Sequence, residues 1–229
     1  MIKLIKLHSN YLLNKRVLFV ILLLTTIFLI CLFFSSGIST SKFEKQMYLY
    51  EYKFNYKNSG FIMIKFTQIV LSILLFSYCF DKNQDQYIPF ILTRGISKEK
   101  YFISKVLTAW IVISLYWSLL IILFYIFGNI CLSIKTMNIS RFLLIYLLSM
   151  LYGMYSLIFV LLINTSMISV LMILSFWISE IIVGSSEILD VILPSIQNGE
   201  FKYGCEYVII LITLIFLLNT YIYTSRQLV

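Results

Sequence analysis

Charged side chains are scarce in this sequence. Asp, Glu, Lys and Arg together make up 12% of its 229 residues, about half the share typical of soluble domains. Apolar residues account for 61%, and the mean hydropathy is +0.95. No polar stretch is long enough to form a second folded unit. The composition therefore excludes an ordinary soluble protein and predicts one integral membrane domain over residues 1–229.

Residues that carry catalysis or bind metals are also few. The chain has one histidine, His8, and four cysteines without CxxC spacing, so a metal site has no support. An intramembrane protease needs a Ser–His pair, paired carboxylates or a His-rich metal site within its spans, and none is present. None of the eight glycines is followed by lysine, so no G-x-x-x-x-G-K-[ST] phosphate loop occurs. We expect a chain that is not an enzyme and has no cofactor of its own.

The net charge of +8 does not indicate nucleic acid as a partner. The lysines and arginines flank apolar runs, whereas a nucleic-acid interface needs a basic stripe on a polar fold. Membrane lipid is the expected partner of these charges. The excess of lysine over arginine and the single alanine, Ala109, are typical of a protein from an AT-rich bacterial genome.

Six apolar segments are long enough to cross a bilayer, which requires about 20 residues. The fold class predicted is therefore all-α, with six transmembrane helices. The fourth and fifth segments are separated only by Asn164 and Thr165, which favours a tight antiparallel hairpin. The predicted spans cover residues 17–36, 61–80, 106–127, 142–163, 166–183 and 207–224.

Six spans place both termini on one side of the membrane. The segments on the side of the termini contain more lysine and arginine than those on the other side, and cytoplasmic segments are usually the richer in these residues. We therefore expect a multi-pass protein of the cell membrane with both termini in the cytoplasm. Residues 37–60 would then lie outside. Four lysines alternate there with aromatic residues, and the segment is either a helix lying on the outer membrane surface or a solvated loop.

The loop between the second and third spans, residues 81–105, has the densest charge in the chain. Ser97 is a natural N-cap for the third span, with Glu99 in the first turn, where the helix dipole favours a carboxylate. Upstream, residues 86–94 predict a short helix that tolerates Pro89 in its first turn and ends at Gly95. We expect a rigid helix–turn–helix elbow at the cytoplasmic face.

The six spans, the basic N-terminal tail and the run ILTRGISKEKYFISKVL at residues 91–107 resemble the membrane subunits of type-two ABC transporters, the export permeases. The positions that match that family's pattern are Leu92, Arg94, Gly95, Ile96, Ser97, Lys98 and Lys105.

The resemblance implies that residues 86–94 form a coupling helix. This helix would dock on a separate ABC ATPase subunit, which would bind ATP and Mg²⁺. A second permease chain, identical or different, would complete the substrate path for a peptide or small amphipathic compound. The residues expected to couple to the ATPase are Tyr87, Phe90, Ile91, Leu92, Arg94, Ser97 and Lys98.

Glu180 lies near the outer end of the fifth predicted span, where a carboxylate is costly and a role in the substrate path or in gating is a natural suspicion. Snorkelling to the membrane surface, or a Tyr or Ser partner, would also explain a carboxylate at this position. The alternative function for the whole chain is a membrane immunity or sensor-anchoring protein without a transport path, which would not need a force-transmitting elbow.

Overall fold

The computed structural model describes residues 2–36, 48–80, 95–134, 139–163, 165–183, 196–197, 200–201 and 204–225. Within these ranges the fold is helical, as predicted. The only strands there are β1 (Ile196–Gln197) and β2 (Glu200–Phe201), an antiparallel pair that places Ile196 opposite Phe201. The helices are α1 (Ile2–Leu12), α2 (Lys15–Ser35), α4 (Leu49–Cys79), α6 (Lys98–Leu132), α7 (Ile139–Ile163), α8 (Ser166–Val183) and α10 (Gly204–Ser225).

Five of these helices are long and apolar enough to cross a membrane: α2, α4, α6, α7 and α10. They coincide with five of the six predicted spans, two of which, 17–36 and 61–80, extend one residue past the end of the helix. The remaining predicted span coincides with α8 in its bounds, but the apolar stretch described there, Ser166–Ser175, is shorter than a bilayer requires. Five candidate membrane helices are therefore shown, and a sixth span stays a prediction.

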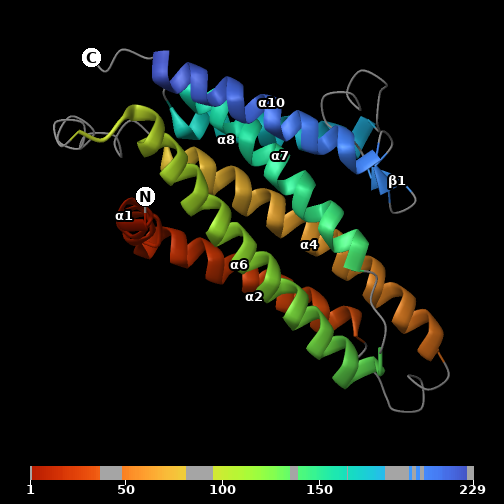
Figure 1. Ribbon diagram of the computed structural model, residues 1–229. Coiled ribbons are helices and arrows are strands. Elements are labelled where there is room, and N and C mark those ends of the chain that lie inside the picture. Colours follow the sequence, from red (N-terminus) through yellow and green to blue (C-terminus); the bar gives the residue numbers. More distant parts are fainter. Residues whose placement is uncertain are drawn as a thin grey trace.

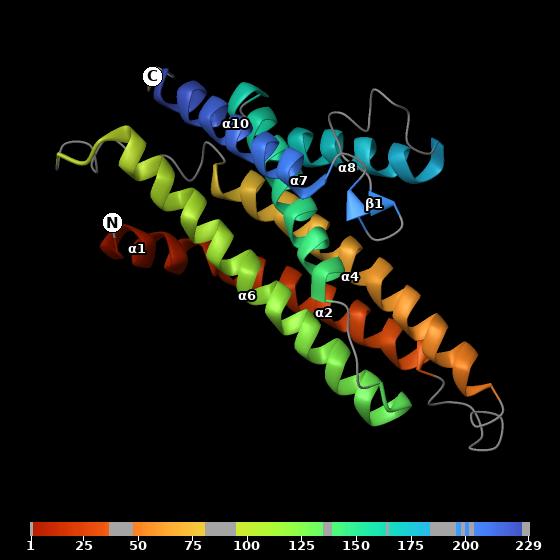
Figure 2. The same ribbon diagram turned by 45° about the vertical axis from the view of Figure 1, so that its right-hand side comes forward.

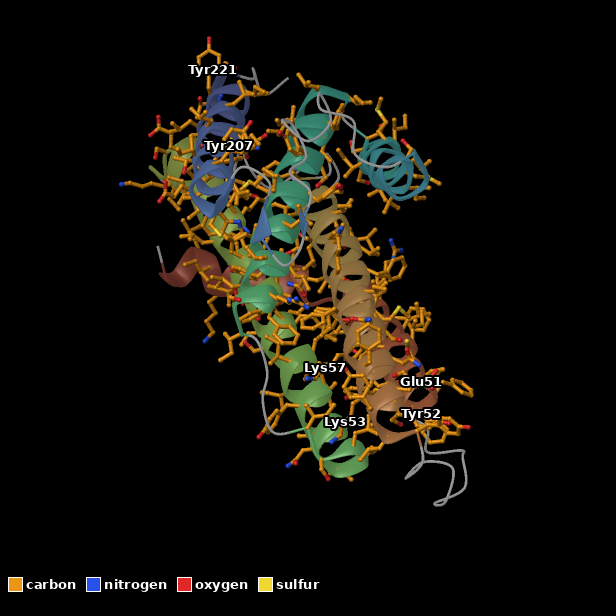
Figure 3. All side chains as sticks on the ribbon, turned by 90° about the vertical axis from the view of Figure 1, so that its right-hand side faces the viewer. Glu51, Tyr52, Lys53, Lys57, Tyr207 and Tyr221 are labelled. Atoms are coloured by element: carbon orange, nitrogen blue, oxygen red, sulfur yellow. The ribbon has the colours of Figure 1, made fainter. Side chains whose placement is uncertain are left out.

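Helix α4 begins earlier than the second predicted span. Residues 49–60 continue the helix as one straight element (Figure 1), so this part of the 37–60 segment is helical and not a loop, whereas residues 37–47 lie outside the described part of the chain. At 1.5 Å per residue, 31 residues measure about 46 Å, well beyond a ~30 Å hydrocarbon core. Figure 3 shows Lys53 and Lys57 on one side of this extension and Glu51 and Tyr52 on the other.

Helix α4 lies at the centre of the bundle, where it contacts α2, α6, α7 and α8. It packs closely on α7, where Gly153 leaves no room for a Cβ atom beside Ser72 and Phe76. The hydroxyl of Ser156 donates to the carbonyl of Gly153 at 2.7 Å and also lies 3.4 Å from the carbonyl of Ile73, across the same interface. Small residues thus allow the two backbones to approach closely, as is common in membrane bundles.

Several helix ends, far apart in the sequence, lie together at one end of the bundle. Helix α1, the end of α4, the start of α6 and the end of α10 all lie at one end (Figures 1 and 2). Helix α8 diverges from the other helices toward its far end, as Figure 2 shows. Accordingly, most of its described side chains are exposed, including Met167 and Leu171, whereas Ser169 and Ile173 are buried against α7 and α4.

Candidate functional site at the elbow junction

The predicted elbow joins the bundle where α4 ends and α6 begins. Six side chains from four helices meet at this place and form what we call the junction cluster: His8, Phe80, Tyr101, Phe102, Lys105 and Tyr223. All of them are buried, with Phe102 fully inaccessible and Phe80 only 2% exposed.

Aromatic rings form the centre of the junction cluster. The ring centroid of Phe80, directly after α4, lies 5.3 Å from that of Phe102 in α6. Tyr223 of α10 completes the group, 5.0 Å from Phe102 and 6.0 Å from Phe80. Such pairs contribute about 0.5–1.5 kcal/mol each beyond their buried area. The end of α4, the start of α6 and the end of α10 are therefore held together as one unit.

Lys105 places a cationic side chain inside this cluster. Its Nζ lies 5.1 Å from the ring centroid of Phe80 and 4.9 Å from that of Tyr101, and only 4% of the residue is exposed. A desolvated ammonium over aromatic faces is attracted by about 2 kcal/mol. Lys105 thus links the residue that follows α4 to the first turns of α6, on the other side of the elbow.

Helix α1 is fastened to the same place by His8. Its ring meets that of Tyr101 edge-on, with centroids 4.8 Å apart, and 7% of the residue is exposed. Burial, reinforced by the positive charge of Lys105, lowers the pKa of His8 to about 4. The imidazole is consequently neutral at physiological pH. On the opposite side of α1, Lys6 and Asn10 are exposed, so the helix is amphipathic.

The start of α6 follows the sequence prediction closely. Ser97 is the N-cap, and its Oγ accepts a hydrogen bond from the backbone N–H of Lys100 at 3.4 Å. Gly95 adopts a positive φ of 77°, a backbone conformation that favours glycine and suits a sharp turn before the helix. Lys98 is the first residue of α6 and is half-buried.

The other predicted coupling residues lie outside the described residues: Tyr87, Phe90, Ile91, Leu92 and Arg94. The coupling helix itself therefore remains a prediction. Glu180 lies within α8, but its side chain is likewise outside the described part, and its predicted role in the substrate path is untested. Among the described residues, no group of three His, Cys, Asp or Glu side chains could hold a metal ion.

Sequence reasoning missed helix α1 and the cluster that it completes. The signal was present in the spacing of Leu4, His8 and Leu12, four residues apart, with the polar residues Lys6 and Asn10 between them. His8 was considered only as a metal ligand or catalytic residue, and Lys105 only as a position that matches the export permeases. The two meet because α1 packs against α6, which residue spacing alone does not reveal.

The fold and the junction cluster define a helical protein with five helices that could cross a membrane, three of which, α4, α6 and α10, are joined at one end by a buried cluster of mainly aromatic residues. No protein-family model, curated protein or solved structure matches the chain.

Proposed function

We propose that this chain is the permease subunit of an ATP-driven exporter of the cell membrane, with both termini in the cytoplasm. It moves a peptide or a small amphipathic compound outward, together with a second permease chain. The energy comes from a separate ABC ATPase subunit, which binds ATP and Mg²⁺ and docks on residues 86–94.

The junction cluster is the observation that best supports this proposal. Residues 81–94 are bounded by Phe80 and Gly95, and the chain on either side of them is anchored by the contacts of Phe80 with Phe102 and Lys105. A flexible loop on loosely held ends would absorb a push from a partner. Because both ends of the elbow are packed in one buried cluster, a displacement of the elbow is transmitted to α4 and α6.

Further contacts connect the junction cluster to the middle of α4, α6 and α10. Phe216 of α10 lies 6.1 Å from Phe102 and 6.3 Å from Trp110, measured between ring centroids. Farther along, Gln68 of α4 donates to the carbonyl of Ile113 in α6 at 3.2 Å. Displacement of the elbow would therefore move α4, α6 and α10 together, as a permease that alternates between two arrangements requires.

The test is to recover the tagged chain from its native host in mild detergent and to identify the proteins that accompany it. We expect a P-loop ATPase in stoichiometric amount, and its loss when Phe90→Ala and Arg94→Ala are combined. Phe54→Ala combined with Lys57→Ala is the matched control, because these residues are exposed on the part of α4 at the opposite end of the bundle.

Two results would contradict the proposal. One is recovery of the intact chain without any ATPase, which would favour a membrane immunity or sensor-anchoring protein. The other is equal loss of the ATPase in the control pair, which would show that docking does not depend on the elbow. Retained membrane insertion of every variant must be verified by detergent extraction and gel filtration.

A further inference from the structure

An open groove of about 380 Å³ lies along the middle of α6, beside α7. Its volume is within the range of small-molecule sites, roughly 300–1,000 Å³. The lining residues are Leu107, Trp110, Ile111, Ser114, Leu115, Ser118 and Tyr146. Six of the seven are on α6, within the third predicted span, so the groove opens at membrane depth, where Ile111 and Leu115 are exposed.

Tyr146, the lining residue contributed by α7, is held in place by contacts with Trp117. The indole N–H of Trp117 donates to the carbonyl of Phe142 in α7 at 3.0 Å. The ring of Trp117 in turn packs on Tyr146, with centroids 5.4 Å apart. Tyr146 is therefore positioned before any ligand arrives, which lowers the entropy cost of binding.

The hydroxyl protons of Ser114, Ser118 and Tyr146, which line the groove, are all donated to other atoms of the protein. Ser114 donates to the carbonyl of Trp110 at 2.8 Å, and Ser118 donates to that of Ser114 at 2.9 Å. The 2.7 Å contact between the Ser114 and Tyr146 hydroxyls must therefore use the proton of Tyr146. What remains on the oxygens of Ser118 and Tyr146 is lone pairs.

The one other polar hydrogen among the lining side chains is not available to a ligand. The Nε1 atom of Trp110 is buried, although the residue as a whole is only partly so. Leu107, Ile111 and Leu115 supply apolar surface. The groove thus presents acceptors without accessible side-chain donors, in a region where hydrocarbon cannot satisfy them and a charged ligand would be costly.

We propose that this groove binds an apolar chain that carries an uncharged hydrogen-bond donor, a hydroxyl or an amide N–H. The donor hydrogen bonds to the oxygens of Tyr146 and Ser118, and the chain lies along the leucine and isoleucine side chains of α6. The assignment of this ligand class to exported cargo rests on the proposed function, whereas binding itself does not.

The test uses the purified full-length chain in lipid nanodiscs, without any ATPase. The probes are a diazirine-bearing dodecanol and its methyl ether, which differ by the donor alone. After photolysis, labelled peptides are quantified by mass spectrometry. We expect saturable labelling of residues 107–118 and of Tyr146 by the alcohol, roughly 2- to 10-fold above the ether, as one neutral hydrogen bond implies.

Variants localise the effect. Tyr146→Phe and Ser118→Ala should each reduce labelling by the alcohol toward the level of the ether. Tyr125→Phe, an exposed tyrosine of α6 outside the groove, should leave it unchanged. Because the pair of probes is compared on the unaltered chain, the result stands even if a variant fails to fold.

Equal labelling by alcohol and ether would overturn the proposal, because the groove would then be an ordinary lipid-facing surface. Absence of label from residues 107–118 would also overturn it and would indicate that a second copy of the chain covers this face. Donor-dependent labelling in a chain that recruits no ATPase would uphold the binding site and refute only the transport function.

Discussion

The rings of His8 and Tyr101 meet edge-on with their centroids 4.8 Å apart, and this contact fastens the N-terminal helix to the first turns of α6. Tyr101 is also in contact with the ammonium of Lys105. One tyrosine therefore touches both the imidazole of His8 and the side chain of Lys105. Helix α1, which precedes all the apolar spans, is thereby an integral part of the bundle.

Acidification should destabilise the protein through His8. The pKa of His8 is about 4 in the folded chain, against an ordinary value of 6.5, so the unfolded chain binds the proton first as the pH falls. Protonation of His8 leaves the free energy of unfolding unaffected above pH 6.5 and decreases it between pH 6.5 and 4, by up to about 3 kcal/mol. Thermal unfolding of detergent-purified protein at pH 7 and pH 5 measures the change.

The control for this prediction is His8→Gln, which removes the only histidine in the chain. Its unfolding temperature should depend much less on pH over the same interval. An identical pH dependence in the variant and the unaltered protein would show that other groups are responsible.

Lys105→Met should weaken the junction cluster. The substitution keeps a long apolar side chain but removes the ammonium that lies over Phe80 and Tyr101, at a cost of about 1–2 kcal/mol. It also removes a charge that lowers the pKa of His8, so the pKa in the folded chain should rise toward 6.5 and the loss of stability on acidification should be smaller than in the unaltered protein. Lys57→Met, at the opposite end of α4 and exposed, is the control and should leave both quantities unaltered.

Gly153→Ala should destabilise the contact between α4 and α7. An added Cβ atom would meet Phe76 and Ser72 at less than van der Waals distance, and overpacking of this kind costs about 1–3 kcal/mol. The unfolding temperature measures the loss. Combining the substitution with Phe76→Leu should recover part of it, whereas strictly additive losses would contradict the contact.

The N-terminal part of α4 should be accessible from outside the cell. Tyr50 is 86% exposed and lies about three turns before the start of the second predicted span. In a chain whose native cysteines are replaced by serine, Tyr50→Cys should react with a membrane-impermeant maleimide on intact cells. Ser97→Cys, at the other end of the bundle, should react only after the cells are opened. The reverse pattern would invert the proposed orientation.

Hydrophobic patterning predicted the positions of the long helices well, because an apolar run of span length has few alternatives in a membrane protein. The cap at Ser97 was equally readable, since it depends on local backbone geometry. The extension of α4 to Leu49 was missed because its aromatic and lysine residues suit a membrane surface as well as a helix. Tyr56 shows why the helix prevails: its hydroxyl donates to the carbonyl of Phe124 at 2.6 Å, a contact with α6.

The candidate site was predicted only in part, for a similar reason. Ser97 and Lys98 border the elbow, but the cluster that anchors it draws on α1, α4, α6 and α10, which are far apart in sequence. Phe80 and Tyr223 look like ordinary apolar residues of two separate spans. Only the packing of those spans places their rings 6.0 Å apart.

The central claim is that nucleotide binding by a partner moves α6 and α10 through the junction cluster. Its most direct test is the distance between spin labels attached at Leu119→Cys on α6 and Leu214→Cys on α10, both exposed, in the cysteine-free chain co-purified with its ATPase. The account predicts a distance change on addition of ATP and Mg²⁺ that Phe102→Ala abolishes while the ATPase stays bound. An unchanged distance in the unaltered cluster, or the same change in Phe102→Ala, would contradict it.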